Sequence, residues 1–330
     1  MPTDGEFDRI RAMLSVASAL DPSDQVVIGP GDDAAVVHPR RNESIVLSTD
    51  LSIEGVHFRR DWLTWESIGY RAAAAALSDL AAMAARPVGI LVSLAMPSEL
   101  DTAVYEQITC GLTACLRPAD AVLLGGDTSR SPGPVMIDVV AVGGVETAIG
   151  RSGALPGDEL WVTGRLGGAA AAVLALQSGL EPGPGDRRSF ERPAPRWREA
   201  RWLAQRDAMS AAIDLSDGLA GDAAHLARAS GVRLEICVDR LPVASSLESW
   251  SDSSVSLAIA AGGGEDYELL FAARPGVMSD VRDEFQTTFG LELSRIGHVV
   301  DGGGVGWVDR AGEPSVSPAA AGFDHFTDPV

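Results

Sequence analysis

The stretch Ala211-Ala-Ile-Asp-Leu-Ser-Asp-Gly218 takes an apolar run directly into an acidic turn closed by glycine. This pattern predicts a strand up to Leu215 and a helix over 218–230. The N-terminus of a helix binds anions through its free N–H groups, although carboxylates there can also be plain caps. Capping accounts for Asp217 but leaves Asp214 unexplained, so we treat the turn as a candidate ligand site of an α/β fold.

Acidic residues occupy similar positions elsewhere along the chain. They are Asp32 and Asp33 in 29–33, Asp50 at the end of 46–50, Asp127 after Gly125 and Gly126, and Glu265 and Asp266 after three glycines at 262–264. Ligands of α/β sheets bind at the carboxyl ends of strands, so we expect these carboxylates to converge on one rim of a sheet. Clustered carboxylates repel one another, and the cation that suits them is Mg²⁺, which usually completes its shell with substrate phosphates. The sequence therefore predicts a magnesium and phosphate site.

Several of these motifs also have an ordinary structural explanation when taken alone. Gly31-Asp-Asp is as readily a plain turn, and carboxylates before a helix are often caps. Ser48-Thr-Asp50 favours a metal or phosphate site more strongly, because three oxygen-bearing side chains end an apolar strand. Asp79 lies in an otherwise apolar predicted helix, where a carboxylate is costly to bury unless it is paired or bound to a metal. The alternative is that Asp79 faces solvent.

Lysine is absent from the sequence, and all 26 basic residues are arginine. This excludes a Walker-A phosphate loop and a protein-kinase site, which both depend on a lysine. It also excludes a pyridoxal-phosphate enzyme, which needs a lysine for its Schiff base. If the protein handles a nucleoside triphosphate, metal ions and arginines must supply the counter-charge.

The overall composition excludes several other classes of protein. A formal net charge of −20 argues against nucleic acid as a partner, because binding the phosphate backbone needs a basic surface. The three cysteines form no C-x-x-C pair, which suits a reducing cytosol. The acidic N-terminal residues do not form a signal peptide, and no apolar run is long enough for a membrane span. We therefore expect a cytoplasmic protein.

The order of predicted elements suggests two α/β or α+β halves. In the first half we predict strands over 44–49, 88–95, 121–124 and 135–145, and helices over 66–85 and 101–116. In the second half we predict strands over 159–163, 211–215, 232–238, 266–273, 293–299 and 305–309, and helices up to 177 and over 196–206, 218–230, 253–261 and 277–289. The turn-rich run 150–158 marks the junction, and 179–195 is expected to be a mobile loop. The expected domains are therefore 1–150 and 151–330.

The remaining motifs exclude more than they indicate. The five histidines show no H-x-H or H-E-x-x-H spacing, so zinc is not expected; His57, seven residues after Asp50, is the one we place near a site. Gly164-Arg-Leu-Gly-Gly168 does not match G-x-G-x-x-G, so a Rossmann dinucleotide site is not expected. A serine hydrolase would need a G-x-S-x-G elbow, which is also missing.

Taken in order, the motifs resemble one family across almost the whole chain. They are Gly31-Asp-Asp33, Ser48-Thr-Asp50, Glu54-Gly-Val-His-Phe58, Ala76-Leu-Ser-Asp-Leu80, Gly125-Gly-Asp-Thr128, Asp214-Leu-Ser-Asp-Gly218, Gly263-Gly-Glu-Asp-Tyr-Glu-Leu269 and Gly322-Phe-Asp-His-Phe326. This set resembles the thiamine-monophosphate kinase family of the aminoimidazole ribonucleotide synthetase-like superfamily. The resemblance implies a two-domain fold whose N-terminal α/β domain forms a barrel across a homodimer, and whose C-terminal α/β domain covers nucleotide and substrate.

The resemblance also implies a role for individual residues. Several Mg²⁺ ions would be held by Asp33, Ser48, Thr49, Asp50, Asp79, Asp127, Asp214 and Asp217. ATP would contact Gly126, Asp127, Arg151 and Ser216, and thiamine monophosphate would contact His57, Glu265 and Phe323. Two departures stand out: Thr109 aligns with a nucleotide-contacting tyrosine of relatives, and an arginine-rich string of relatives is reduced to Arg192-Pro-Ala-Pro-Arg196. We still expect Arg192 or Arg196 to close over a phosphate.

The activity implied is ATP-dependent phosphorylation of thiamine monophosphate to thiamine diphosphate. Transfer would be direct and in line, assisted by Mg²⁺, with no residue acting as a covalent nucleophile. Two alternatives remain open at this point. One is a sister ATP-dependent synthetase of the same superfamily, and the other is a non-catalytic acidic metal-binding protein.

Overall fold

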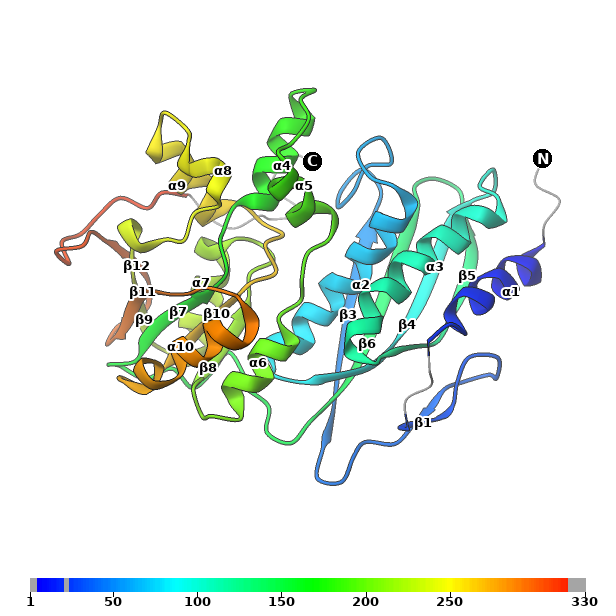
Figure 1. Ribbon diagram of the computed structural model, residues 1–330, viewed down its shortest axis with the longest axis horizontal. Helices are drawn as coiled ribbons and strands as arrows, with labels where there is room; N and C mark the ends of the chain where they lie inside the picture. Colours follow the sequence, from blue (N-terminus) through cyan, green and yellow to red (C-terminus); the bar gives the residue numbers. More distant parts are fainter. Residues whose placement is uncertain (1–4, 21–23, 320–330) are drawn as a thin grey trace. The chain divides into compact units, whose positions relative to one another are not determined.

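The chain folds into two compact units, each with its own sheet. The computed structural model describes residues 5–20 and 24–319 (Figure 1). Of these residues, the first unit takes those up to Leu80 together with Ala85–Thr147, and the second takes Ala81–Ala84 together with residues 148–319. Within the described residues, no helix has both the length and the apolar character needed to cross a membrane.

The first unit is built on a four-stranded mixed sheet. Its strand order is β3 (Ser44–Ile53), β6 (Met136–Val145), β4 (Arg86–Pro97) and β5 (Val122–Ser131). The pairs β3–β6 and β6–β4 are antiparallel, whereas β4 and β5 are parallel. A separate two-stranded ribbon joins β1 (Val26–Ile28) to β2 (Val36–Val37).

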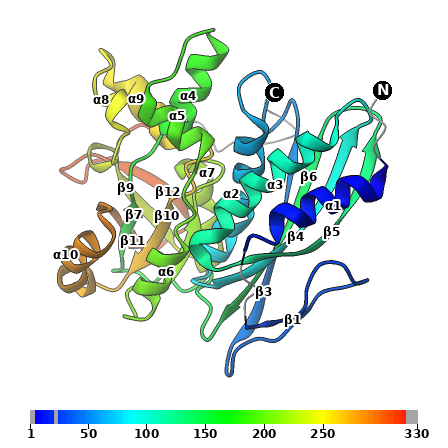
Figure 2. The same cartoon turned by 45° about the vertical axis from the view of Figure 1, so that its right-hand side comes forward.

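Two helices, α2 (Trp65–Ala82) and α3 (Thr102–Leu116), run side by side along the sheet of the first unit (Figures 1 and 2). They approach closely because each has a glycine at the contact. A Cβ on Gly69 would lie 2.1 Å from the carbonyl oxygen of Ile108, and one on Gly111 would lie 1.9 Å from that of Glu66. The helix α1 (Glu6–Ala17), which the sequence analysis did not predict, and the short 3₁₀ helix η1 (Arg117–Ala119) complete this unit.

The second unit is a six-stranded sheet with helices on both faces. Its strand order is β12 (Gly304–Val308), β9 (Arg233–Cys237), β11 (Leu293–Val300), β7 (Glu159–Thr163), β10 (Leu269–Ala273) and β8 (Ala211–Asp214). Only the β12–β9 pair is parallel. The helices are α4 (Gly168–Gln177), α5 (Pro184–Glu191), α6 (Trp197–Ala204), α7 (Leu219–Ser230), α8 (Ser245–Glu248), α9 (Ser253–Gly262) and α10 (Val277–Phe289), with a 3₁₀ helix η2 (Val238–Arg240).

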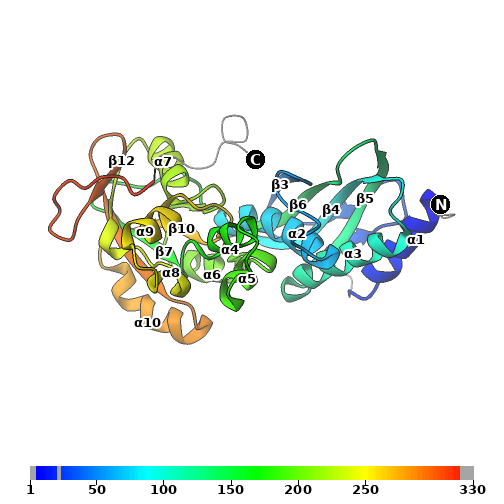
Figure 3. The ribbon, with the colours of Figure 1, turned by 90° about the horizontal axis from the view of Figure 1, so that it is seen from above.

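Alternation along β7 explains the three layers of this unit. Leu160 and Val162 face the core that contains Leu226 of α7, whereas Trp161 faces the core that contains Phe285 of α10. Accordingly, α7 lies on one side of β7 and β10 and α10 on the other (Figure 3). Because helices cover both faces of the sheet, the acidic loops of this unit are left at the ends of its strands.

Three sequence-based predictions about individual elements are wrong. The segment 179–195 is not an irregular loop, because α5 forms within it: Pro184 starts the helix, Phe190 is buried, and Arg187 pairs with Glu191 one turn later. The strand predicted over 266–273 begins only at Leu269. Asp50 and Asp127 lie inside β3 and β5 and not at strand ends, and Gly126 lets β5 continue because a Cβ there would lie 1.9 Å from the oxygen of Val92.

Candidate functional site

Asp79 and Ser48 meet in the first unit. α2 directs the Asp79 carboxylate toward β3, where Ser48 Oγ donates a hydrogen bond to Asp79 Oδ2. Asp79 is therefore half-buried against the sheet, which decides against the solvent-facing alternative. Because the Ser48 hydroxyl donates its hydrogen bond to the carboxylate, the lone pairs of its oxygen remain suited to a metal ion.

The same chemistry recurs one residue further along β3. Thr49 Oγ1 donates to Asp138 Oδ1 at 2.9 Å, and Asp138 belongs to the neighbouring strand β6. Asp138 was not singled out from the sequence, although it is the one acidic residue within the strand predicted over 135–145. Since side chains alternate along a strand, Ser48 and Asp50 share one face of the sheet and Thr49 lies on the other.

The other predicted ligands of the first unit lie on β5 and in the N-terminal loop. Asp127 is exposed, lies beside Ser93 in the register of β5 and β4, and accepts at Oδ1 from the N–H of Thr128 at 2.9 Å. Asp33 is also exposed, and its N–H donates to Asp32 Oδ1 at 2.8 Å. Thr109 is fully buried and donates to the carbonyl of Tyr105 at 2.8 Å, so its hydroxyl is occupied within α3.

In the second unit, two acidic loops interlock through their backbones. The loop 215–218 follows β8, and the loop 263–268 precedes β10. Glu265 N–H donates to the Ser216 oxygen at 2.7 Å and Tyr267 N–H donates to the Leu215 oxygen at 2.8 Å. In the reverse direction, Leu215 N–H donates to the Glu268 oxygen at 2.8 Å. These bonds extend the β8–β10 pairing beyond the sheet and bring Ser216 beside Glu265.

The packing of these loops allows little alternative geometry. Gly218 has φ of +103°, and a Cβ on it would lie 2.9 Å from the carbonyl of Gly262. Glu265 and Tyr267 adopt φ of 68° and 51°, in the left-handed region that L-residues avoid. Such residues cost about 1–3 kcal/mol each and persist where the surroundings impose them, commonly at functional sites. The strain here supports a functional role for Glu265.

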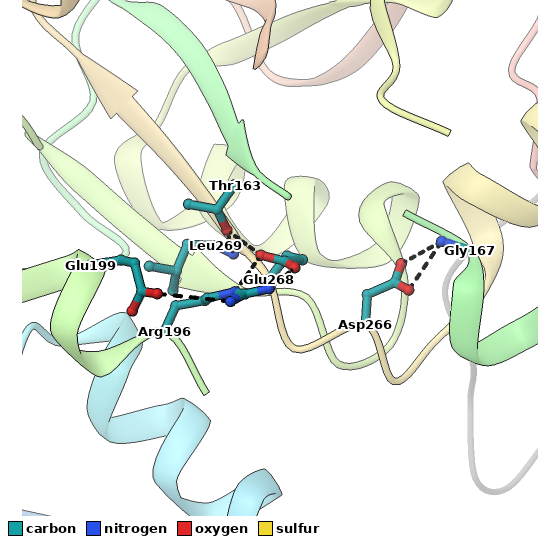
Figure 4. Close-up of polar contacts among 7 residues, drawn as sticks. All are labelled: Thr163, Gly167, Arg196, Glu199, Asp266, Glu268 and Leu269. Carbon is teal, nitrogen blue, oxygen red and sulfur yellow. Dashed lines mark hydrogen bonds and ion pairs between the residues drawn. The ribbon is translucent and has the colours of Figure 1, made fainter. Parts of the chain in front are cut away.

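Asp266 and Glu268 are framework residues of the loop (Figure 4). Both carboxylate oxygens of Asp266 accept from the N–H of Gly167, at 3.0 and 2.9 Å, which caps the start of α4. Burial raises the pKa of the Asp266 carboxyl well above its usual range. Glu268 accepts from Thr163 Oγ1 at 2.6 Å, and a Cβ on Gly164 would lie 2.2 Å from Glu268 Oε1.

Arg196 belongs to the same framework. Its Nε donates to Glu268 Oε2 at 2.7 Å and its Nη2 to Glu268 Oε1, while Nη1 lies 3.8 Å from Glu199 Oε1 (Figure 4). Burial raises the pKa of Glu199 although the Arg196 charge opposes the shift. The Arg196 guanidinium is thus already paired with Glu268. It would have to leave this ion pair to close over a phosphate, as expected of Arg192 or Arg196.

Asp222 is a second carboxylate, besides Asp138, that the sequence did not single out. It lies in the first turn of α7 and accepts from the N–H of Asp217 at 3.1 Å. Burial raises the pKa of Asp222 to about 8, and the nearby charges of Asp217 and Asp214 act in the same direction, with Arg151 opposing them. A bound cation would relieve the repulsion among these three carboxylates. Its sequence signal was an acidic residue one turn into an apolar helix.

The structure does not bring all predicted ligands to one rim of one sheet. Asp33, Asp50, Asp79 and Asp127 belong to the first unit, and Asp214, Asp217 and Glu265 to the second. Over residues 5–20 and 24–319, no three His, Cys, Asp or Glu side chains form a ready-made metal site. Phe323 lies outside the described residues.

Comparisons with known proteins agree with this architecture. The family model of the AIR synthase related protein N-terminal domain matches residues 31–145, and that of the C-terminal domain matches 156–309. A thiamine-monophosphate kinase of Salmonella typhimurium is 36% identical over 98% of this chain and 96% of its own length. The crystal structure of thiamine-monophosphate kinase from Stenotrophomonas maltophilia is 34% identical, with a TM-score of 0.81, over 95% of this chain and 98% of its own.

A third comparison concerns a relative solved with ligands. The structure of AaThiL complexed with AMPPCP and TMP is 31% identical, with a TM-score of 0.75, over 98% of this chain and 97% of its own. The chain thus has both domains of the AIR synthase related proteins. Within that class it belongs to the thiamine-monophosphate kinase family. The predicted family and two-domain α/β fold are confirmed.

Proposed function

We propose that this protein transfers the γ-phosphoryl group of ATP to thiamine monophosphate, giving thiamine diphosphate and ADP. The observation that carries the proposal is the set of acidic residues, positioned on two lysine-free units that align with thiamine-monophosphate kinases over nearly the whole chain. The relative bound to AMPPCP and TMP holds an ATP analogue and a second phosphate ligand in one protein, which supports the same pair of substrates here.

Mg²⁺ ions are part of this proposal. In the first unit they would be held by Asp33, Ser48, Thr49, Asp50, Asp79 and Asp127, and in the second by Asp214 and Asp217. The donor chemistry fits, because Ser48 and, on the opposite face of β3, Thr49 each donate a hydrogen bond to a carboxylate and keep oxygen lone pairs for a hard cation. Bound Mg²⁺ would neutralise and orient two polyanionic substrates.

The remaining assignments concern the two substrates. Gly126, Asp127, Arg151 and Ser216 would contact ATP. His57, Glu265 and Phe323 would contact thiamine monophosphate. The hydrogen bond from Glu265 N–H to the Ser216 oxygen supports this pairing, since it holds a proposed substrate residue beside a proposed nucleotide residue. Residues 1–150 would supply metal, ATP and dimer contacts, and 151–330 would cover both substrates.

The proposal also includes a homodimer built through the first unit. β3 is an edge strand, and its Ile45, Leu47 and Leu51 side chains remain 40%, 65% and 46% exposed. They alternate with Ser48 and Asp50 and so lie on the opposite face of the strand. This face also carries Thr49 and Asp138, but its exposed apolar side chains are typical of an interface, and a second copy of this chain would cover them in the barrel that the family resemblance implies.

One assay tests the proposed reaction. ATP, Mg²⁺ and thiamine monophosphate should yield thiamine diphosphate and ADP in equal amounts, and free thiamine should be a poor acceptor because it lacks the phosphate. Turnover with formylglycinamidine ribonucleotide instead would indicate a sister synthetase. Mg²⁺ binding without any ATP turnover would indicate a non-catalytic metal-binding protein.

A further inference from the structure

The turn after β3 is closed by its own backbone. Gly55 N–H donates to the Phe58 oxygen at 2.8 Å, and the N–H groups of Val56 and His57 donate to the Ile53 oxygen at 3.1 and 2.9 Å. Phe58 is only 5% exposed and anchors the end of the turn in the core. The turn 53–58 therefore has a defined geometry, although it lies at the end of an edge strand.

A hydrogen bond within this turn decides which ring nitrogen of His57 carries a proton. Ile53 N–H donates to His57 Nδ1 at 3.1 Å. A backbone N–H can only donate, so Nδ1 must offer its lone pair, and the proton of the neutral imidazole resides on Nε2. His57 is thereby a hydrogen-bond donor at Nε2 and not a proton acceptor there.

Glu54 clamps the same turn to the β5–β6 connection. Its N–H donates to the Val135 oxygen at 2.9 Å, and its Oε2 accepts from the Val135 N–H at 3.0 Å. Its other oxygen, Oε1, pairs with Nε of Arg60. The Glu54 side chain is 18% exposed and Val135 is fully buried. A carboxylate bound on both sides in this way is occupied with holding the turn.

We infer that Glu54 is a positioning residue that fixes the turn 53–58, so that His57 offers its Nε2–H to a phosphate oxygen of the substrate. The inference rests on the proposed function for the identity of that substrate. A phosphate monoester near neutral pH presents mainly acceptor oxygens. A neutral ring with a proton at Nε2 binds such an oxygen, whereas the other tautomer would place lone pair against lone pair.

The state of the ring can be measured without any enzyme activity. In the full chain labelled with ¹⁵N-histidine, long-range ¹H–¹⁵N NMR should show His57 with an unprotonated Nδ1 and a protonated Nε2, the signal being assigned by its loss in His57→Gln. Glu54→Ala should convert this single tautomer to a mixture. The matched control is Glu43→Gln, which breaks a buried ion pair with Arg86 next to the other end of β3 and should leave the His57 signals unchanged. A protonated Nδ1 in the unmodified protein would overturn the inference.

Kinetics test the positioning role separately. Glu54→Ala should raise the KM for thiamine monophosphate about tenfold with the ATP KM unchanged, as expected for one lost hydrogen bond to a charged group. Glu54→Gln keeps an oxygen for the Val135 N–H and should recover most of the affinity, which also covers the case in which Glu54→Ala does not fold. Glu43→Gln should change neither KM. If Glu54→Gln, Glu54→Ala and the unmodified protein all had the same KM for thiamine monophosphate, the role of Glu54 would be overturned.

Two substitutions at His57 distinguish its two nitrogens. Gln can place an N–H near the position of Nε2, and Asn near that of Nδ1, so His57→Gln should bind thiamine monophosphate more tightly than His57→Asn. The reverse order would contradict donation from Nε2. If the chain did not phosphorylate thiamine monophosphate at all, the proposed function would fail, while the NMR experiment would still decide the tautomer and the effect of Glu54.

Discussion

The guanidinium of Arg196 and the carboxylate of Glu268 form a bidentate ion pair inside the second unit. Their side chains are 17% and 6% exposed. Arg196 precedes α6, and Glu268 directly precedes β10 and closes the strained loop that carries Glu265. The pair therefore links the helix start to the loop proposed to contact substrate.

We expect Arg196→Ala to lower the free energy of unfolding of the second unit by about 3–5 kcal/mol, because it leaves the Glu268 charge buried and unpaired. Arg196→Lys should not rescue it, since a single ammonium cannot reproduce the two parallel bonds. Urea denaturation measures both. The control is Arg165→Ala, which breaks an exposed pair with Glu248 and should cost less than about 1 kcal/mol. If both substitutions lowered the free energy of unfolding by a similar amount, the buried pair would contribute no more to stability than the exposed one.

Asp79→Asn should abolish phosphoryl transfer and leave the fold largely intact. The amide can still accept from Ser48 Oγ, but it removes the charge proposed to hold Mg²⁺. Steady-state turnover and circular dichroism check the two halves of this statement. Asp61→Asn, which breaks an exposed pair with Arg59, is the control and should keep full turnover. Near-normal turnover in Asp79→Asn would remove Asp79 from the proposed metal site.

Asp222 should make the metal-free protein less stable as the pH rises. The folded pKa of about 8 lies above the ordinary carboxyl value near 4, so the folded state holds the proton more tightly. The contribution of Asp222 to the free energy of unfolding is therefore fully present below about pH 4. It falls by up to about 1 kcal/mol per pH unit between pH 4 and 8 and is constant above pH 8. Thermal denaturation in EDTA should show this slope in the unmodified protein and a flatter one in Asp222→Asn.

A control for this pH effect is Asp280→Asn. Asp280 is likewise in the first turn of a helix of the second unit, but it is exposed. The substitution should leave the slope between pH 4 and 8 unchanged. Parallel stability curves for the unmodified protein and Asp222→Asn would mean that Asp222 keeps its charge without cost.

ATP binding itself, and not only turnover, should depend on divalent cations. The chain has no lysine to share the phosphate charge, and the groups proposed at the site are mainly carboxylates. In calorimetry, EDTA should weaken ATP binding by well over about tenfold, monovalent salt should not restore it, and Mn²⁺ should substitute for Mg²⁺ because it also accepts octahedral oxygen ligands. Equal binding in EDTA would indicate that arginines such as Arg151 carry the phosphate charge.

Local patterns in the sequence were sufficient to predict most elements of both units. The helix over 277–289 and the strand over 159–163 have the predicted bounds, because apolar periodicity and flanking glycines act locally. The loop 179–195 was misjudged for the opposite reason. Its proline and arginines are typical of a loop, but α5 is stabilised by burial of Phe190, which is a tertiary effect.

The sequence by itself determined the family, the exclusion of lysine-dependent chemistry and the identity of the acidic motifs, because these depend only on which residues are present and in what order. Only the tertiary structure decided what each carboxylate does. Within the motif at 263–269, Asp266 caps α4 and Glu268 pairs with Arg196, whereas Glu265 is the residue proposed to contact substrate. Similarly, Glu54 holds a turn, whereas His57 in the same motif is the residue proposed to contact substrate. The partners come from segments distant in the chain, and hydrogen bonding depends on distance in space and not on separation in sequence.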